Sequence, residues 1–195
     1  MGKILLGSQS PRRKEILLYF HLPFEIKAPD FDESSIAYQG NPEQLACKIA
    51  EGKGSSLASQ FPNSTIITAD TIVSYEKHVF FKPSDENEAF QMLKALSGKT
   101  HQVLTAVSVR LKKECYTNFG RTFVTFNHLT DKQIKQYLQT EEGKDKAGSY
   151  GGQEKGSLLI HSIDGSYDNM VGLPVNVLNG LLNQIGIDLW DYIAS

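Results

Sequence analysis

The feature that most constrains this fold is the segment Ser64–Ser74 (STIITADTIVS), which is rich in β-branched and apolar residues and encloses one carboxylate, Asp70. This composition is typical of a strand that is buried on both faces of a sheet. A charge inside such a strand is costly unless it is paired or coordinates a metal ion. Asp70 is therefore expected either to have a buried partner or to take part in chemistry.

The rest of the chain predicts strands and helices that alternate early and two long adjacent strands in the middle. Ser10 is expected to cap a helix that begins at Pro11, because its hydroxyl can accept a hydrogen bond from a free backbone N–H. Thr130 and Gln133 form a capping-box pattern. The expected strands span residues 3–6, 24–27, 64–74, 79–81, 102–112, 115–127 and 157–163, and the other expected helices span 41–53, 84–96, 130–140 and 174–185. We expect an α/β fold with a mixed central sheet flanked by helices.

Composition and charge exclude several classes of protein. Of the 195 residues, 40% are hydrophobic and 22% are charged, which argues against disorder, collagen and coiled coils. Twenty Lys and Arg residues against 22 Asp and Glu give a net charge of −2, so bulk charge does not favour binding to nucleic acid. The length suits one domain or two small lobes, and we expect a single domain over residues 1–195.

Cysteine content and hydropathy indicate the compartment. Cys47 and Cys115 are far apart and have no His or Cys at metal-ligand spacing, so neither a disulfide framework nor a zinc site is expected. The apolar run near the N-terminus is too short for a signal peptide, and no stretch reaches the roughly 20 apolar residues of a membrane span. We expect a cytoplasmic protein without a membrane partner.

Ser8–Arg13 (SQSPRR) joins the first expected strand to the first expected helix. Loops at this place in α/β proteins commonly bind phosphates, since helix N-termini favour anions. The segment offers the hydroxyls of Ser8 and Ser10, and the guanidiniums of Arg12 and Arg13 match phosphate oxygens. The alternative is an N-cap followed by two exposed arginines.

Further charged residues lie in loops and on helices. Asp32 and Glu33 follow a proline, and carboxylates there could bind a hard cation, since Mg²⁺ prefers a few oxygen ligands and several waters. Solvated loop acids are the alternative. Lys53 and Lys82 could each be a solvated surface lysine, as most lysines are.

The Gly-rich segment 144–156 is expected to be a loop. It is not a dinucleotide-binding fingerprint, because it precedes a strand instead of joining a strand to a helix. Its backbone could wrap closely around a ligand, and Gln153 offers an amide donor and an acceptor for the edge of a base. A surface turn is the alternative.

Nucleophilic catalysis by a side chain is not supported, since the sequence has no Gly-x-Ser-x-Gly elbow and no paired histidines.

Taken together, these segments resemble the Maf family of nucleoside triphosphate pyrophosphatases. The motifs appear in family order and extend from Leu5 to Pro174, which makes the set specific although each one is weak. The matching segments are Ser8–Arg13, Glu33, Ile49–Lys53, Ala69–Thr71, Lys82–Pro83, Ser97–Val103, Lys146–Gln153, Gly165–Tyr167 and Val171–Pro174.

The resemblance implies an enzyme that hydrolyses the bond between the α- and β-phosphates of a nucleoside triphosphate, giving the monophosphate and pyrophosphate. It also implies a Maf/ITPase-like fold of two lobes with an intervening cleft, a divalent metal cofactor (Mg or Mn) and a homodimer. A role in cell-division arrest or in cleansing the nucleotide pool is implied at the same level. The alternatives are a catalytically idle nucleotide-sensing regulator of septum formation and a nucleic-acid-binding regulator. The charge balance disfavours the second.

The resemblance also assigns roles to residues of this chain. Arg12, Thr71 and Gln153 match the selectivity positions of the subgroup that acts on dTTP and UTP, with modified pyrimidine nucleotides as further candidates. Because phosphoryl transfer needs the charge of the triphosphate held in place, we expect cations and hydroxyls at the phosphates and carboxylates at a metal ion. We expect Asp70 to act as general base, either directly or through a metal-bound water whose pKa the cation lowers. The expected site residues are Ser8, Ser10 and Arg13 for substrate binding, Glu33, Lys53, Asp70 and Lys82 for catalysis, and Glu33 and Asp70 for the metal.

Overall fold

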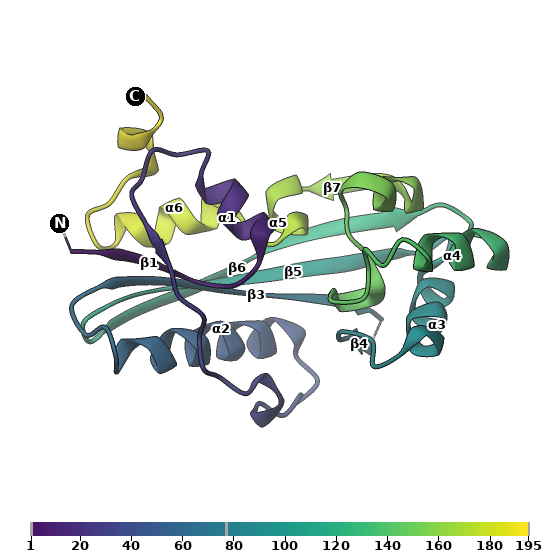
Figure 1. Ribbon diagram of the computed structural model, residues 1–195, viewed down its shortest axis with the longest axis horizontal. Coiled ribbons are helices and arrows are strands. Elements are labelled where there is room, and N and C mark those ends of the chain that lie inside the picture. Colours follow the sequence, from purple (N-terminus) through teal and green to yellow (C-terminus); the bar gives the residue numbers. More distant parts are fainter. Residues whose placement is uncertain (1, 77, 195) are drawn as a thin grey trace. The chain divides into compact units, whose positions relative to one another are not determined.

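The computed structural model describes residues 2–76 and 78–194 (Figure 1). Contacts between residues divide the chain into two compact units. Unit 1 contains the residues up to Asp70, residues 105–120 and the residues from Gly172 on. Unit 2 contains residues 71–104 and 121–171. Among the described residues, no helix is both long and apolar enough to cross a membrane.

The described residues form one mixed sheet, which confirms the expected α/β class. Its strands follow the order β2-β1-β3-β5-β6-β7, with β4 paired to β3. β1 is parallel to β2 and β3, whereas the β3–β4 and β6–β7 pairs are antiparallel. The strands are β1 (Ile4–Gly7), β2 (Glu25–Ile26), β3 (Thr65–Tyr75), β4 (His78–Phe80), β5 (Thr100–Leu111), β6 (Glu114–Phe126) and β7 (Ile160–Gly165).

In unit 1, helix α2 (Pro42–Ala58) covers one face of the strands, and α1 (Pro11–Leu17) and α6 (Val175–Asn183) cover the other (Figure 1). α2 begins where Asn41 caps it, since the side chain accepts a hydrogen bond of 2.8 Å from the Gln44 N–H. Its buried residues recur every fourth position, at Leu45, Ile49, Lys53 and Leu57. The helical period therefore places Lys53 on the stripe that faces the sheet.

Parallel pairing of β1 with β3 brings two candidate segments together within unit 1. Gly7, the last residue of β1, pairs with Thr68, two residues before Asp70. Parallel strands run in the same direction. Ser8 and Asp70 therefore both lie just beyond the carboxyl end of the β1–β3 pairing. Ligands of open α/β sheets bind outside this end of the strands.

In unit 2, α3 (Glu86–Leu96) and α4 (Asp131–Leu138) pack against each other. The capping box of Thr130 and Gln133 is present. A core of buried side chains that includes Leu93, Val124 and Ile134 holds these helices to the strands.

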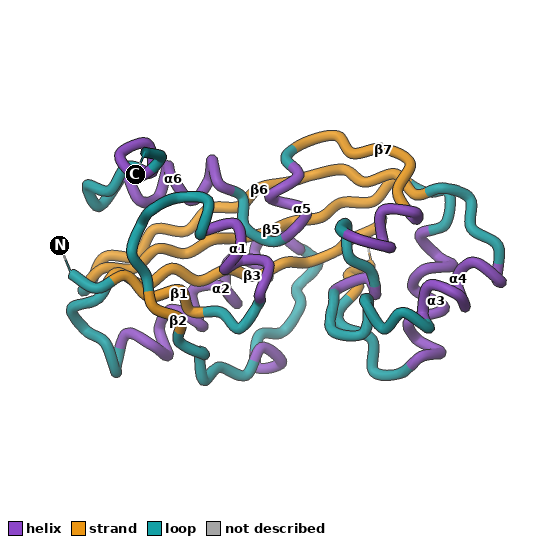
Figure 2. The backbone as a smooth tube through the Cα atoms, turned by 45° about the horizontal axis from the view of Figure 1, so that its top comes forward, coloured by secondary structure: helices purple, strands orange, loops and turns teal. Residues whose placement is uncertain are grey.

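The expected strand over 157–163 is wrong at its start. Residues Glu154–Leu159 form a 3₁₀ helix, η3, and β7 begins only at Ile160, lying beside β6 in Figure 2. The short-range hydrogen bonds of η3 extend to Ile160, whose N–H bonds the Ser157 carbonyl, so the residues before it follow a 3₁₀ helix and not a strand. The expected loop 144–156 likewise contains a 3₁₀ turn, η2 (Ala147–Ser149). Helix α5 (Tyr167–Val171) was not expected.

Candidate active site

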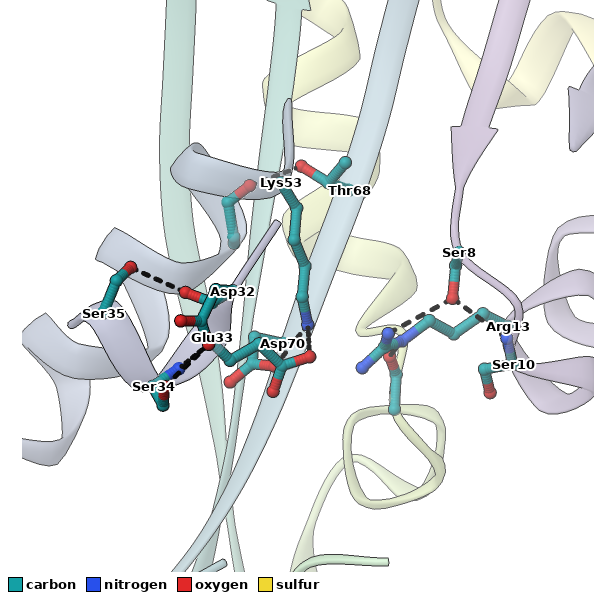
Figure 3. A network of polar contacts seen from close by, with 12 residues as sticks. Ser8, Ser10, Arg13, Asp32, Glu33, Ser34, Ser35, Lys53, Thr68 and Asp70 are labelled. Atoms are coloured by element: carbon teal, nitrogen blue, oxygen red, sulfur yellow. Dashed lines mark hydrogen bonds and ion pairs between the residues drawn. The ribbon is translucent and has the colours of Figure 1, made fainter. Parts of the chain in front are cut away.

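A buried ammonium between two carboxylates forms the centre of the site in unit 1. The Lys53 Nζ lies 2.8 Å from Asp70 Oδ1 and 2.9 Å from Glu33 Oε1 (Figure 3). The side chains of Lys53 and Asp70 are only 9% and 10% exposed, whereas that of Glu33 is 43% exposed. Asp70 thus has the partner that its place in an apolar strand requires, and Lys53 is not the solvated surface lysine of the alternative interpretation.

Glu33 reaches Lys53 because its segment is packed onto α2. It begins the 3₁₀ helix η1 (Glu33–Ser35), which replaces the loop that was expected there. The Asp32 carboxylate accepts hydrogen bonds from the N–H (2.9 Å) and the hydroxyl (2.7 Å) of Ser34 and so caps η1. The Phe31 ring lies where a Cβ at Gly52 would be only 2.2 Å from it. Gly52 therefore permits the close approach that brings Glu33 beside Lys53.

Arg13 is fixed by two groups at the other side of the site. Its Nη1 donates to Ser8 Oγ over 3.3 Å, and its Nε donates to the Gly172 carbonyl over 2.8 Å. Figure 3 shows its guanidinium pointing toward the Lys53–Asp70 pair. The Gly172 carbonyl was not expected in the site, although the Val171–Pro174 motif that contains it was noted in the sequence.

The expected capping bond of Ser10 is wrong. Ser10 has the extended backbone of an N-cap residue, but its hydroxyl makes no capping hydrogen bond. Its backbone N–H instead donates to Ser8 Oγ over 3.1 Å. Pro11 explains why α1 can begin without the cap, because its ring fixes φ for the first turn and it has no N–H to satisfy. The Ser10 hydroxyl lies beside Arg13 (Figure 3).

Burial and charge act in opposite directions on the ionisable groups. Burial raises the pKa of Asp70, and the positive charges of Lys53 and Arg13 only partly offset this. Burial lowers the pKa of Arg13, against the effect of Asp70, but a guanidinium keeps its charge in proteins. The site therefore holds a carboxylate that is more basic than usual beside two cations.

The carboxylate pair can be compared with the needs of a divalent metal ion. Within residues 2–76 and 78–194, no group of three or more His, Cys, Asp or Glu side chains is arranged to hold a metal. Glu33 and Asp70 nevertheless direct one oxygen each at a single cation, the Lys53 ammonium. Mg²⁺ is often held by one or two carboxylates together with substrate phosphates and water. The donor set fits a metal ion of that kind.

The remaining candidate residues are described within their own units. Arg12 is partly buried on α1 in unit 1. In unit 2, Thr71 is partly buried in β3, Lys82 is exposed after β4, and Gln153 is partly buried between η2 and η3.

Within unit 2, the segments of Lys82 and Gln153 are joined through Gly148. The Gly148 N–H donates to the carbonyl of Phe81, the residue before Lys82, over 3.3 Å. Gly148 has φ +68°, and a Cβ there would lie 3.0 Å from the Val73 side chain. Only glycine adopts this conformation in such a narrow space without strain. The joining role of Gly148 was missed in the sequence, where only the Gly-rich composition pointed to it.

Comparisons with known proteins show which family and fold the chain resembles. A family model described as Maf-like protein matches residues 3–185. The chain is 44% identical over 193 residues to a dTTP/UTP pyrophosphatase of Chlamydia caviae, covering 98% of both chains. It is 44% identical over 189 residues to a dTTP/UTP pyrophosphatase of Bacillus cereus, covering 97% of this chain and 98% of that one. A solved structure, the Ham1 protein of Staphylococcus aureus, is similar with a TM-score of 0.50 and 16% identity, covering 94% of this chain and 99% of that one, which supports the fold alone.

Proposed function

Because the chain belongs to the Maf family, we propose that it is a nucleoside triphosphate pyrophosphatase that converts dTTP and UTP to the monophosphate and pyrophosphate. The relatives from Chlamydia caviae and Bacillus cereus that carry this name match almost the whole chain. The observation that carries the proposal is the buried Lys53–Asp70 pair, joined by Glu33, beside the carboxyl end of β1, with Asp70 two residues beyond the last β1–β3 pair. Modified pyrimidine nucleotides are further candidate substrates.

The cations and hydroxyls of the site hold the triphosphate. Its roughly four negative charges must be fixed while water attacks, and positioning with electrostatic stabilisation is the main demand of phosphoryl transfer. Arg13 and Lys53 supply positive charge, and Ser8 and Ser10 supply hydroxyl donors. Lys82, which is exposed in unit 2, is assigned to the phosphates as a further cation.

Asp70 acts as the general base. Its oxygen accepts a proton from the water that attacks the α-phosphorus. The bond from this phosphorus to the bridging oxygen breaks, and its electron pair leaves on that oxygen with pyrophosphate. A general base works best when its pKa lies close to the working pH. The burial that raises the pKa of Asp70 moves it in that direction, and Lys53 holds the carboxylate at 2.8 Å before metal and substrate bind.

A divalent cation, Mg²⁺ or Mn²⁺, completes the proposed site. Glu33 and Asp70 would hold it, and it would supply charge neutralisation and lower the pKa of bound water. The Lys53 ammonium now lies between these two carboxylates. Lys53 is therefore expected to turn toward the phosphates when both are bound.

Arg12, Thr71 and Gln153 are the proposed selectivity residues. The amide of Gln153 can pair with the carbonyl and the ring N–H of uracil or thymine, because it carries both a donor and an acceptor. A site that is indifferent to the 5-methyl group and to the 2′-hydroxyl would accept both dTTP and UTP.

The test is a hydrolysis panel across the common nucleoside triphosphates, 7-methyl-GTP and modified pyrimidine nucleotides. We expect dTTP and UTP to be hydrolysed with the highest kcat/KM and to give pyrophosphate in equal amount to the monophosphate. Faster hydrolysis of GTP or 7-methyl-GTP would contradict the role of Gln153. Binding of dTTP without hydrolysis would favour the nucleotide-sensing alternative, against which the presence of Glu33 and Asp70 argues.

The pH dependence of catalysis should follow Asp70. Protonated Asp70 can neither accept a proton nor hold the metal ion. The kcat/KM for dTTP should therefore fall as the pH drops through the pKa that Asp70 has in the enzyme free of metal and substrate, which burial holds above the ordinary value of 3.8. The measurement is kcat/KM from about pH 4 to about pH 9 at fixed ionic strength. A kcat/KM that stays undiminished down to about pH 4 would contradict the assignment.

The proposal also includes the domain organisation, the compartment and the oligomeric state of the protein. We propose that residues 1–195 act as a single Maf-like domain built from the two units, that the protein is cytoplasmic, and that it forms a homodimer. The proposed binding partner is the nucleoside triphosphate substrate, and we propose neither a nucleic acid nor a membrane as a partner. A link to cell-division arrest or to cleansing of the nucleotide pool follows from the family.

A further inference from the structure

The segment that carries Gln153 is held at several residues within unit 2. Its backbone N–H groups are bonded at Gly148, Gly151 and Gly156, and a Cβ at Gly152 would lie 2.2 Å from the Met170 methyl group. The acceptors are the Phe81 carbonyl, the Tyr137 hydroxyl and the Glu142 carboxylate, in that order. The backbone on both sides of Gln153 is therefore fixed in place.

Two residues of this segment other than glycine have left-handed backbone. Ser149 has φ 60° and Glu154 has φ 49°. Such conformations are unfavourable for side chains with a Cβ and persist only where the surrounding structure imposes them. They lie on either side of Gln153, so the conformation that presents Gln153 depends on its anchors.

Tyr150 is the anchor that ties the segment to the sheet. Its hydroxyl lies 2.6 Å from the Nε2 of His101, a residue of β5. Its ring also makes edge contacts with the rings of His101 and Phe126, with centroids 5.4 Å and 4.7 Å apart. Burial lowers the pKa of His101 to about 4 and raises the pKa of Tyr150, so both groups are neutral near pH 7.

We propose that Tyr150 and His101 are positioning residues that hold Gln153 in the conformation that reads the base, and this rests on the proposed function. Tyr150 is 5% exposed, so it acts through the backbone leading to Gln153 and not by touching the base. The sheet supplies a rigid support because His101 and Phe126 lie on β5 and β6. The pair therefore determines substrate selection and does not take part in the chemical step.

Substitution of Tyr150 is expected to change KM much more than kcat. Tyr150→Phe keeps the ring and removes the hydroxyl, so the segment loses its hydrogen bond to β5. In the full-length protein with Mg²⁺, we expect KM for dTTP and UTP to rise about tenfold and kcat to stay within about twofold. The preference for dTTP over GTP should fall by a similar factor. An unchanged KM and preference in Tyr150→Phe would overturn the inference.

A double-mutant cycle with Gln153→Ala separates positioning from general loosening of the fold. If Tyr150 acts through Gln153, Tyr150→Phe should change KM and preference by less than about twofold once Gln153 is alanine. Independent, additive effects of the two substitutions would contradict the inference. Absence of dTTP and UTP hydrolysis by the unaltered protein would instead overturn the proposed function, so the two failures can be distinguished.

Two further variants control for stability. Ile134→Val shortens a fully buried side chain of the same core on α4, outside the segment, and it should leave KM and preference unchanged. A change in Ile134→Val equal to that in Tyr150→Phe would show that selection follows stability alone. If Tyr150→Phe does not fold, the double variant Tyr150→Phe/His101→Leu removes both polar partners, so neither member of the pair is left unsatisfied. The same rise in KM is expected for that variant.

Discussion

Asp70→Asn is expected to lower kcat for dTTP about a thousandfold, because loss of a general base typically costs between a hundredfold and ten-thousandfold. The amide has the shape of the carboxylate, and its oxygen can still accept the 2.8 Å hydrogen bond from Lys53. It has no basic oxygen, however, and cannot take a proton from water. Release of pyrophosphate under saturating dTTP and Mg²⁺ measures the effect.

Nucleotide binding separates the chemical role of Asp70 from a loss of structure. The dissociation constant of dTTP, measured by calorimetry without metal, should stay within about threefold of that of the unaltered protein. Asp30→Asn is the matched control, since Asp30 is an exposed carboxylate that precedes the site segment. It should leave kcat unchanged. Near-normal turnover in Asp70→Asn would remove Asp70 from the mechanism.

Lys53→Met should lower kcat/KM for dTTP about a hundredfold near pH 7, since it removes a preorganised charge from a buried site. The lysine both pairs with Glu33 and Asp70 and is assigned to the phosphates. Its charge also lowers the pKa of Asp70, so without it that pKa should rise further. The acid limb of kcat/KM should therefore move to higher pH. The ionisation of the substrate cannot cause this shift, because the substrate is the same for both proteins.

The same substitution should lower the free energy of unfolding. Breaking a buried ion pair costs about 3 kcal/mol, which the nearby Arg13 should reduce to about 2 kcal/mol. In the variant the folded state holds its proton on Asp70 to a higher pH than the unfolded state does. Stability relative to the unaltered protein should therefore be lower at neutral pH than at an acid pH at which both folded proteins hold the proton on Asp70.

Urea unfolding at both pH values measures the stability effect. Lys48→Met removes an exposed lysine from the same helix and should change neither stability nor activity. An unaltered pH profile in Lys53→Met would show that Lys53 and Asp70 are not coupled as their 2.8 Å contact indicates.

The secondary structure could be read from the sequence where its signals are local. The apolar segment Ser64–Ser74 became β3 with a shift of one residue, and the Thr130–Gln133 capping box formed. The start of β7 could not be found in this way. In a 3₁₀ helix the backbone groups bond within the segment, whereas in a strand they bond to a neighbouring strand. Where the helix ends and β7 begins therefore depends on the position of its partner strand β6.

The sequence allowed us to predict which residue types form the candidate site, but not which of these residues contact one another. Asp70 was identified because a charge in an apolar strand is costly, and the residues that contact it were not identified in this way. Lys53 falls on the apolar stripe of α2, yet a lysine on such a stripe can also extend to solvent. The Gly172 carbonyl carries no side-chain signal, so its hydrogen bond to Arg13, 159 residues earlier, depends entirely on the fold.

The sequence by itself determined the α/β class, most elements, the residue types of the site and the resemblance to the Maf family. These follow from local period, capping chemistry and ordered motifs, which act over a few residues. Only the tertiary structure decided that Lys53 lies between Glu33 and Asp70 and that Tyr150 is bonded to His101. The members of these contacts are separated by 17 to 49 positions in the chain. No local rule specifies such pairs, because they form only when strand pairing and helix packing bring distant segments together.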